Sequence, residues 1–85
     1  MASTFRLKIV TPSGVAVDTD IVYLDITTPD GNIGLLAHHE PMLVKLSDGK
    51  IEYRINEGEE LHPFEVKDAY FSFLGNTAEV ISALI

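Results

Sequence analysis

Apolar and polar side chains alternate one by one along most of this chain, and this period of two constrains the fold more than any other feature. Near the start, Phe5, Leu7 and Ile9 alternate with Arg6 and Lys8. Successive side chains of a β-strand point to opposite faces, so such a stretch buries one face and exposes the other to water. Nowhere does the i, i+3, i+4 spacing of an amphipathic helix persist for the length of a helix. The sequence therefore predicts an all-β fold.

Clusters of Gly, Pro, Asn and Asp divide the alternating pattern into short segments. The segment 21–28 has apolar residues at both odd and even positions, which predicts a central strand covered on both faces. A short strand that starts at Val15 is predicted to break near Asp18, Thr19 and Asp20. The other predicted strands are 5–11, 42–46, 50–56, 61–66, 70–74 and 79–85. Eight to ten short strands at this spacing indicate a small antiparallel β-sandwich or a barrel.

Length and composition limit the possible functions. The chain has 85 residues, which predicts one domain over 1–85. It contains no Cys, which excludes disulfides and thiolate metal sites. Its net charge of −7 argues against nucleic-acid partners. The charge suits a protein partner that presents Arg or Lys, and a role in solubility alone explains it equally well. No stretch approaches the ~20 apolar residues of a membrane span, so we expect no direct membrane insertion.

Motifs for catalysis are missing from the sequence, because it has no Walker A loop, Gly-x-Ser-x-Gly elbow or dinucleotide fingerprint. We therefore expect no enzyme activity and no cofactor. His38, His39, Glu40 and His62 could supply metal ligands. Adjacent residues of an extended segment point to opposite faces, however, which favours ordinary surface histidines. A small metal- or ligand-binding β-domain remains one alternative, and a lipoyl-type carrier with Lys50 as the modified lysine remains another.

The segment 31–41 has the sequence GNIGLLAHHEP and combines two glycines with a histidine pair. Gly31 and Gly34 bracket a point where the chain is predicted to turn tightly, with positive φ at the glycines. Pro41 lacks an N–H and biases Glu40 away from helical conformation. The pattern predicts a shaped loop at the edge of the fold, which is a frequent place for partner contacts. An ordinary turn between two strands explains it equally well.

Two runs of residues, KIVTPSG and the later DGNIGLLAHHEPML, carry a resemblance to a known family. The matching positions are Ile9, Val10, Thr11, Pro12, Gly31, Ile33, Gly34, Leu36, His39, Pro41, Met42, Leu43, Leu46, Phe64 and Val66. In this order they resemble the epsilon subunit of F-type ATP synthases, the subunit named delta in mitochondria. The Gly-x-Ile-Gly-x-Leu-x-x-His-x-Pro pattern is the most specific part, and the resemblance covers the whole chain.

The resemblance implies a β-sandwich of about ten short strands that forms the foot of the rotor's central stalk. In this family the sandwich contacts the gamma subunit on one side and the polar loops of the membrane c-ring below. It carries no chemistry of its own and helps couple proton flow to ATP synthesis. The resemblance also implies a peripheral membrane protein on the cytoplasmic face of a bacterial inner membrane. The family usually continues as a helical hairpin, which we expect to be absent from this chain.

Position by position, the resemblance also implies two contact areas. The gamma-subunit contact would include His39, Pro41 and Met42. The c-ring contact loop would consist of Asp30, Gly31, Asn32, Ile33 and Gly34. Asn32 stands where the family usually has an acidic residue, so this contact is expected either to be weaker or to be shifted to Asp30.

Overall fold

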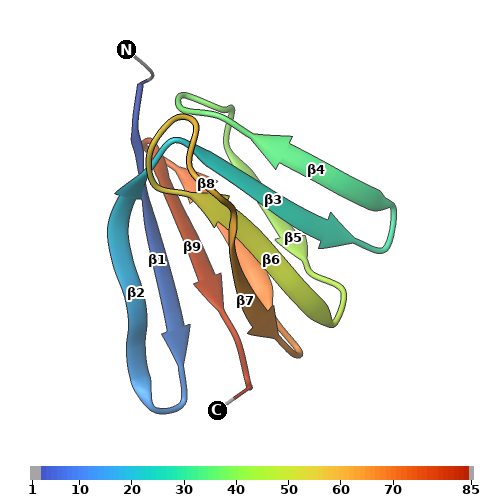
Figure 1. The fold of residues 1–85 in the computed structure, drawn as a ribbon. Helices are drawn as coiled ribbons and strands as arrows, with labels where there is room; N and C mark the ends of the chain where they lie inside the picture. Colours follow the sequence, from blue (N-terminus) through green and yellow to red (C-terminus); the bar gives the residue numbers. More distant parts are fainter. Residues whose placement is uncertain (1–2, 85) are drawn as a thin grey trace.

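The computed structural model describes residues 3–84 and contains nine strands in that range (Figure 1). They are β1 (Phe5–Thr11), β2 (Gly14–Ile21), β3 (Tyr23–Thr28), β4 (Gly31–Leu35), β5 (Met42–Lys45), β6 (Gly49–Arg54), β7 (His62–Val66), β8 (Tyr70–Leu74) and β9 (Thr77–Ile81). No helix that could span a membrane occurs within residues 3–84. The all-β prediction is confirmed.

The strands form two sheets that pack face to face as a sandwich. The five-stranded sheet has the order β2-β1-β9-β8-β5, and the four-stranded sheet has the order β4-β3-β6-β7. All neighbours are antiparallel except β1 and β9, which run parallel. These two strands come from opposite ends of the chain, so no hairpin requires them to be antiparallel. The predicted β-sandwich is confirmed, with one parallel pair that the sequence pattern did not indicate.

The core lies between the sheets and is built from alternate residues of each strand, as the period of two predicts. Phe5, Leu7 and Ile9 of β1 are almost completely buried, whereas Arg6 is exposed and Lys8 is half-buried. The other buried apolar side chains are Ile21, Val22, Leu24, Ile26, Leu35, Leu46, Ile51, Val66, Ala69, Phe71, Phe73, Ala78 and Val80.

The predicted break near Asp18, Thr19 and Asp20 is wrong, because β2 continues through them to Ile21. The aspartates stay in the strand because Arg6, which lies opposite Asp20 on β1, reaches both carboxylates with its guanidinium. Its Nε donates to Asp18 Oδ1 (2.7 Å) and its Nη1 to Asp20 Oδ1 (3.2 Å). Hydrogen bonds to Asp18 and Asp20 raise the pKa of the Arg6 guanidinium above its ordinary value. The guanidinium is charged at neutral pH in any case, and its pairing with both carboxylates offsets the poor strand propensity of aspartate.

The predicted strand 21–28 is divided at Val22, where the chain crosses from the five-stranded to the four-stranded sheet. Both Ile21 and Val22 are buried, because they lie where the chain passes across one end of the core. The Val22 N–H donates to the Arg54 carbonyl (2.9 Å), so the crossing leaves this backbone group paired. The following strand β3 lies between β4 and β6, which confirms its central position. The prediction that both faces are covered is wrong, because Leu24, Ile26 and Thr28 are buried whereas Tyr23, Asp25 and Thr27 on the other face are only half-buried.

The last strand begins two residues earlier than predicted, at Thr77 instead of residue 79, and ends at Ile81. Gly75 (φ 57°) and Asn76 (φ 59°) form a two-residue turn, and Thr77 already pairs with Leu74. Two central residues with positive φ are typical of a type I′ hairpin turn. Residue 85, the predicted end of this strand, lies outside the described residues.

Candidate partner-contact site

Of the predicted c-ring contact loop, only Asp30 lies in the turn between β3 and β4. Gly31, Asn32, Ile33 and Gly34 belong to β4, so the prediction of a loop over these four residues is wrong. Gly31 has a φ of 126°, which confirms the prediction of positive φ at this glycine. The buried Thr28 hydroxyl fixes the turn, because Oγ1 donates to the Gly31 carbonyl (3.0 Å) and accepts from the Asp30 N–H (3.2 Å). Asp30 and Asn32 are exposed. The turn therefore presents the Asp30 carboxylate, close to the Asn32 amide at the start of β4, on a backbone that Thr28 holds in place.

Gly34 serves a different purpose from the predicted one, because its φ is not in the positive range. It lies within β4, where a Cβ atom would approach Tyr23 Oη to 2.9 Å and Cε1 to 3.2 Å. The Tyr23 ring is itself held beside Arg54, whose guanidinium carbon lies 5.6 Å from the ring centroid. Gly34 is thus needed for the close approach of a side chain, and the prediction of positive φ there is wrong.

Replacing Gly34 with valine should lower the free energy of unfolding by about 1 kcal/mol, because the new side chain displaces the Tyr23 ring. In a Tyr23→Ala background the same change should be neutral or stabilising, since valine favours a strand when space is available. Urea denaturation of the four proteins of this double-mutant cycle measures the coupling. An equal penalty in both backgrounds would show that backbone conformation, and not Tyr23, requires the glycine.

The segment between β4 and β5, residues 36–41, carries the predicted gamma contact. It joins the two sheets at one end of the sandwich, at the opposite end of β4 from the turn that contains Asp30 (Figure 1). A five-residue strand is roughly 15 Å long. The structure therefore separates Asp30 from the predicted gamma contact and links the two through one strand, β4.

The two adjacent histidines are held in different ways. The His39 ring is half-buried and packs edge-on against Phe73, with 5.8 Å between ring centroids. His39 Nδ1 lies 2.8 Å from the Glu40 carbonyl, so it carries a proton and donates. In the neutral ring this leaves Nε2 as an acceptor. His38 is exposed with a φ of 64°, and its N–H donates to Asn76 Oδ1 (2.7 Å).

Pro41 and Met42 lie beside His39 at the start of β5 and line an open hollow of about 410 Å³. Leu43, Ser72, Phe73 and Leu74 complete its lining. The structure thus brings together the three predicted gamma-contact residues. It also adds Leu43 and Leu74, which are 77% and 69% exposed.

Further exposed apolar side chains lie on the outer surface of the five-stranded sheet, with the Ser72–Glu79 pair between Leu74 and the Tyr70–Ile81 pair. We call this surface the outer apolar face; its exposed members are Val15, Leu43, Tyr70, Leu74 and Ile81. Strand pairing places Tyr70 beside Ile81 and Val10 beside Val15. Exposed apolar groups that gather on one face mark an interaction surface. The sequence signal that could have found it is an apolar residue at an outward position of a half-buried strand, as at Leu74.

The alternative metal site does not assemble among the described residues. His62 lies on β7 of the four-stranded sheet, where its ring stacks on Tyr53 at 5.4 Å. His38 and His39 belong to the segment between the sheets. Within residues 3–84 no group of three or more His, Asp or Glu side chains is arranged to hold a metal ion.

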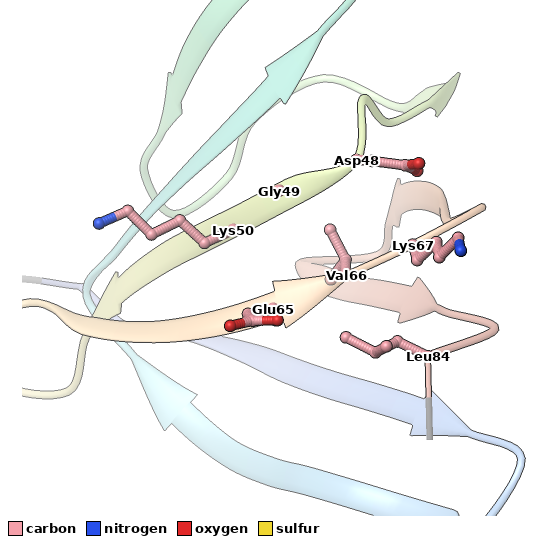
Figure 2. Close-up of a pocket in the computed structure, with 7 residues that line it drawn as sticks. All are labelled: Asp48, Gly49, Lys50, Glu65, Val66, Lys67 and Leu84. Carbon is pink, nitrogen blue, oxygen red and sulfur yellow. The ribbon is translucent and has the colours of Figure 1, made fainter.

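The alternative carrier lysine, Lys50, lies inside β6 and pairs with Glu65 on β7, so it does not occupy a hairpin tip. It lines a hollow of about 370 Å³ together with Asp48, Gly49, Glu65, Val66, Lys67 and Leu84. Figure 2 shows Lys50 and Asp48 pointing in opposite directions, away from each other. In a ligand site the polar groups converge on the ligand. The charged groups around this hollow do not converge in this way.

Comparison with known proteins places these features in context. The family model described as "ATP synthase, Delta/Epsilon chain, beta-sandwich domain" matches residues 4–83. An ATP synthase epsilon chain from Alkaliphilus oremlandii is 33% identical over an alignment of 88 positions that covers 93% of this chain. This chain spans 63% of that relative's length.

Two solved structures share the fold. A chain of the Euglena gracilis mitochondrial ATP synthase, OSCP/F1/c-ring in rotational state 1, superposes with a TM-score of 0.88 at 16% identity. The match covers 99% of this chain and 53% of that one. A chain of the Tetrahymena thermophila mitochondrial ATP synthase, central stalk and c-ring, gives 0.80 at 13% identity, over 98% of this chain and 66% of that one.

Proposed function

Because the chain belongs to the ATP synthase delta/epsilon family, through the β-sandwich domain that matches residues 4–83, we propose that it is a non-catalytic subunit of the central stalk of an F-type ATP synthase. In this role it links the gamma subunit to the membrane c-ring and helps couple proton flow to ATP synthesis. The family match over almost the whole described sandwich is the observation that carries the proposal. The solved structures that share the fold come from ATP synthase assemblies that contain a c-ring.

The proposed gamma-subunit contact is centred on His39, Pro41 and Met42. Pro41 and Met42 line an apolar hollow together with Leu43 and Leu74, and the His39 ring packs against Phe73, which also lines it. Methionine, aromatic and aliphatic groups are typical of the centre of a protein–protein interface. The half-buried His39 adds a polar group whose orientation is fixed by the Glu40 carbonyl. The site therefore suits stable packing against a protein surface.

The proposed c-ring contact consists of Asp30, in the turn before β4, and of Gly31, Asn32, Ile33 and Gly34 in β4 itself. Its exposed carboxylate and the net charge of −7 favour a partner that presents basic groups. The Thr28 hydroxyl holds the backbone of this turn through its hydrogen bonds to Asp30 and Gly31. The turn therefore loses little conformational freedom when a partner binds. With both contacts made, the protein would be peripheral to the membrane, on the cytoplasmic face of a bacterial inner membrane.

Replacing His39 with alanine should weaken binding to the gamma subunit about tenfold, because the variant loses the packed ring and its Nε2 acceptor. The matched control is His38→Asn, since asparagine tolerates the positive φ of this position. We expect the control to change affinity less than about twofold. Calorimetric titration of each variant with purified gamma subunit measures both effects, and thermal unfolding checks that each variant is folded.

If the two variants bind alike, the assignment of His39 is wrong. If the unmodified chain fails to bind gamma at all, the proposed function is wrong.

A further inference from the structure

Asn76, in the turn between β8 and β9, ties together three segments that are far apart in the sequence. Its side-chain Oδ1 accepts from the His38 N–H (2.7 Å), and its Nδ2 donates to the Thr4 carbonyl (3.0 Å). Its own carbonyl accepts from the Arg6 N–H (3.1 Å). The distance to His38 is at the short end for N–H···O hydrogen bonds. Both ends of the amide are therefore engaged at once.

The bond to His38 acts on the backbone at a point of strain. His38 has a φ of 64°, a left-handed conformation that a residue with a side chain adopts only when its surroundings hold it there. Because the chain direction at His38 determines where His39 begins, the hydrogen bond to Asn76 also controls the position of His39.

The β8–β9 hairpin supplies both supports of this segment. Phe73 provides the surface on which the His39 ring packs, and Asn76 follows three residues later and holds the His38 backbone. Two anchors from one hairpin fix the ring and the backbone relative to the same sheet. A contact segment held in this way loses less conformational freedom when a partner binds.

We propose that Asn76 is the positioning residue of the gamma-contact segment: it acts through the His38 backbone to place His39, Pro41 and Met42 before the partner arrives. The inference rests on the proposed function for its binding consequence. Asparagine fits the position for two independent reasons. It tolerates the φ of 59° at this turn, and it offers one donor and one acceptor.

These two reasons can be separated by substitution. Asn76→Gly keeps the positive-φ turn and removes both side-chain hydrogen bonds. Asn76→Asp keeps the turn and the acceptor for His38 but has no donor for the Thr4 carbonyl. Asn56→Gly is the matched control, because Asn56 is also a loop amide and its side chain bonds only to Glu59 in the described residues.

The first measurement is amide hydrogen exchange in the free chain, without any partner. Asn76→Gly should increase the exchange rate of the His38 amide about tenfold or more, since this N–H loses its acceptor. Asn76→Asp should retain most of the protection, and Asn56→Gly should leave it unchanged. Unchanged His38 exchange in Asn76→Gly would overturn the proposal.

The second measurement is the affinity for purified gamma subunit. Asn76→Gly should weaken binding about three- to tenfold, and Asn76→Asp should recover part of that loss. If Asn76→Gly binds no more weakly than Asn56→Gly although His38 exchange has risen, Asn76 orders the segment without positioning it for gamma, and the proposal fails. If the unmodified chain does not bind gamma, the proposed function fails with the binding role, while the exchange result still shows whether Asn76 holds the segment.

Discussion

Replacing Phe73 with alanine should lower the free energy of unfolding by about 3–5 kcal/mol. Phe73 is 1% exposed, and its ring lies 5.6 Å from the ring of Phe5 and 5.8 Å from that of His39. Truncation would open a cavity between the sheets and remove both contacts. The total stability of a domain of 85 residues is only about 4–13 kcal/mol, so the variant would lose a large part of it. Urea denaturation followed by circular dichroism measures the change.

Two control variants show whether buried volume is the cause. Phe73→Leu retains most of the volume and should cost less than about 1.5 kcal/mol. Leu43→Ala removes a large apolar group from the neighbouring strand, but this side chain is 77% exposed and should cost less than about 0.5 kcal/mol. A loss at Leu43 as large as that at Phe73 would contradict the assignment of the two side chains to opposite faces of the sheet.

The period of two was sufficient to predict the strands whose two faces differ in environment. In β1 and β6, the apolar residues at alternate positions are buried or half-buried, as at Leu7 and Ile51. The rule works there because burial of one face repeats with the geometry of the strand. It could not predict the crossing at Val22, because Ile21 and Val22 are both buried and the pattern of two neighbouring apolar residues also fits a central strand.

Features that depend on a partner far away in the sequence could not be predicted from local pattern. Asp18 and Asp20 favour a turn by composition, and only the register of β1, which pairs Arg6 with Asp20, reveals that the Arg6 guanidinium can bond both carboxylates. The parallel pairing of β1 with β9 is similar, since it joins the two ends of the chain. Strand preference is decided largely by such cross-strand neighbours.

In the candidate site, too, the sequence predicted individual residues but not the contacts that depend on strand pairing. The resemblance indicated His39 and Met42, but not that both lie beside Phe73, which depends on the pairing of β5 with β8. Gly31 and Gly34 are equivalent in the sequence pattern. In the structure the first is required by its φ and the second by the Tyr23 side chain.

Replacing Gly31 with alanine should lower the free energy of unfolding by about 1–3 kcal/mol, because its φ of 126° lies in a region that L-residues rarely adopt. Space is not the obstacle, since no atom of the described residues beyond its chain neighbours lies within 4 Å of a Cβ built at this position. Backbone conformation alone should therefore account for the loss. Urea denaturation of the isolated chain measures it.

The decisive comparison is with D-alanine at the same position, introduced by chemical synthesis of the chain. Its mirror-image preference favours positive φ, and it restricts the unfolded chain more than glycine does, so it should stabilise the domain by about 0.4–1 kcal/mol. The two enantiomers place the same methyl group on the same backbone and should shift stability in opposite directions. Equal destabilisation by both would mean that the methyl group, and not the sign of φ, is what the β3–β4 turn excludes. The Asp30 loop would then be shaped by crowding, as β4 is at Gly34.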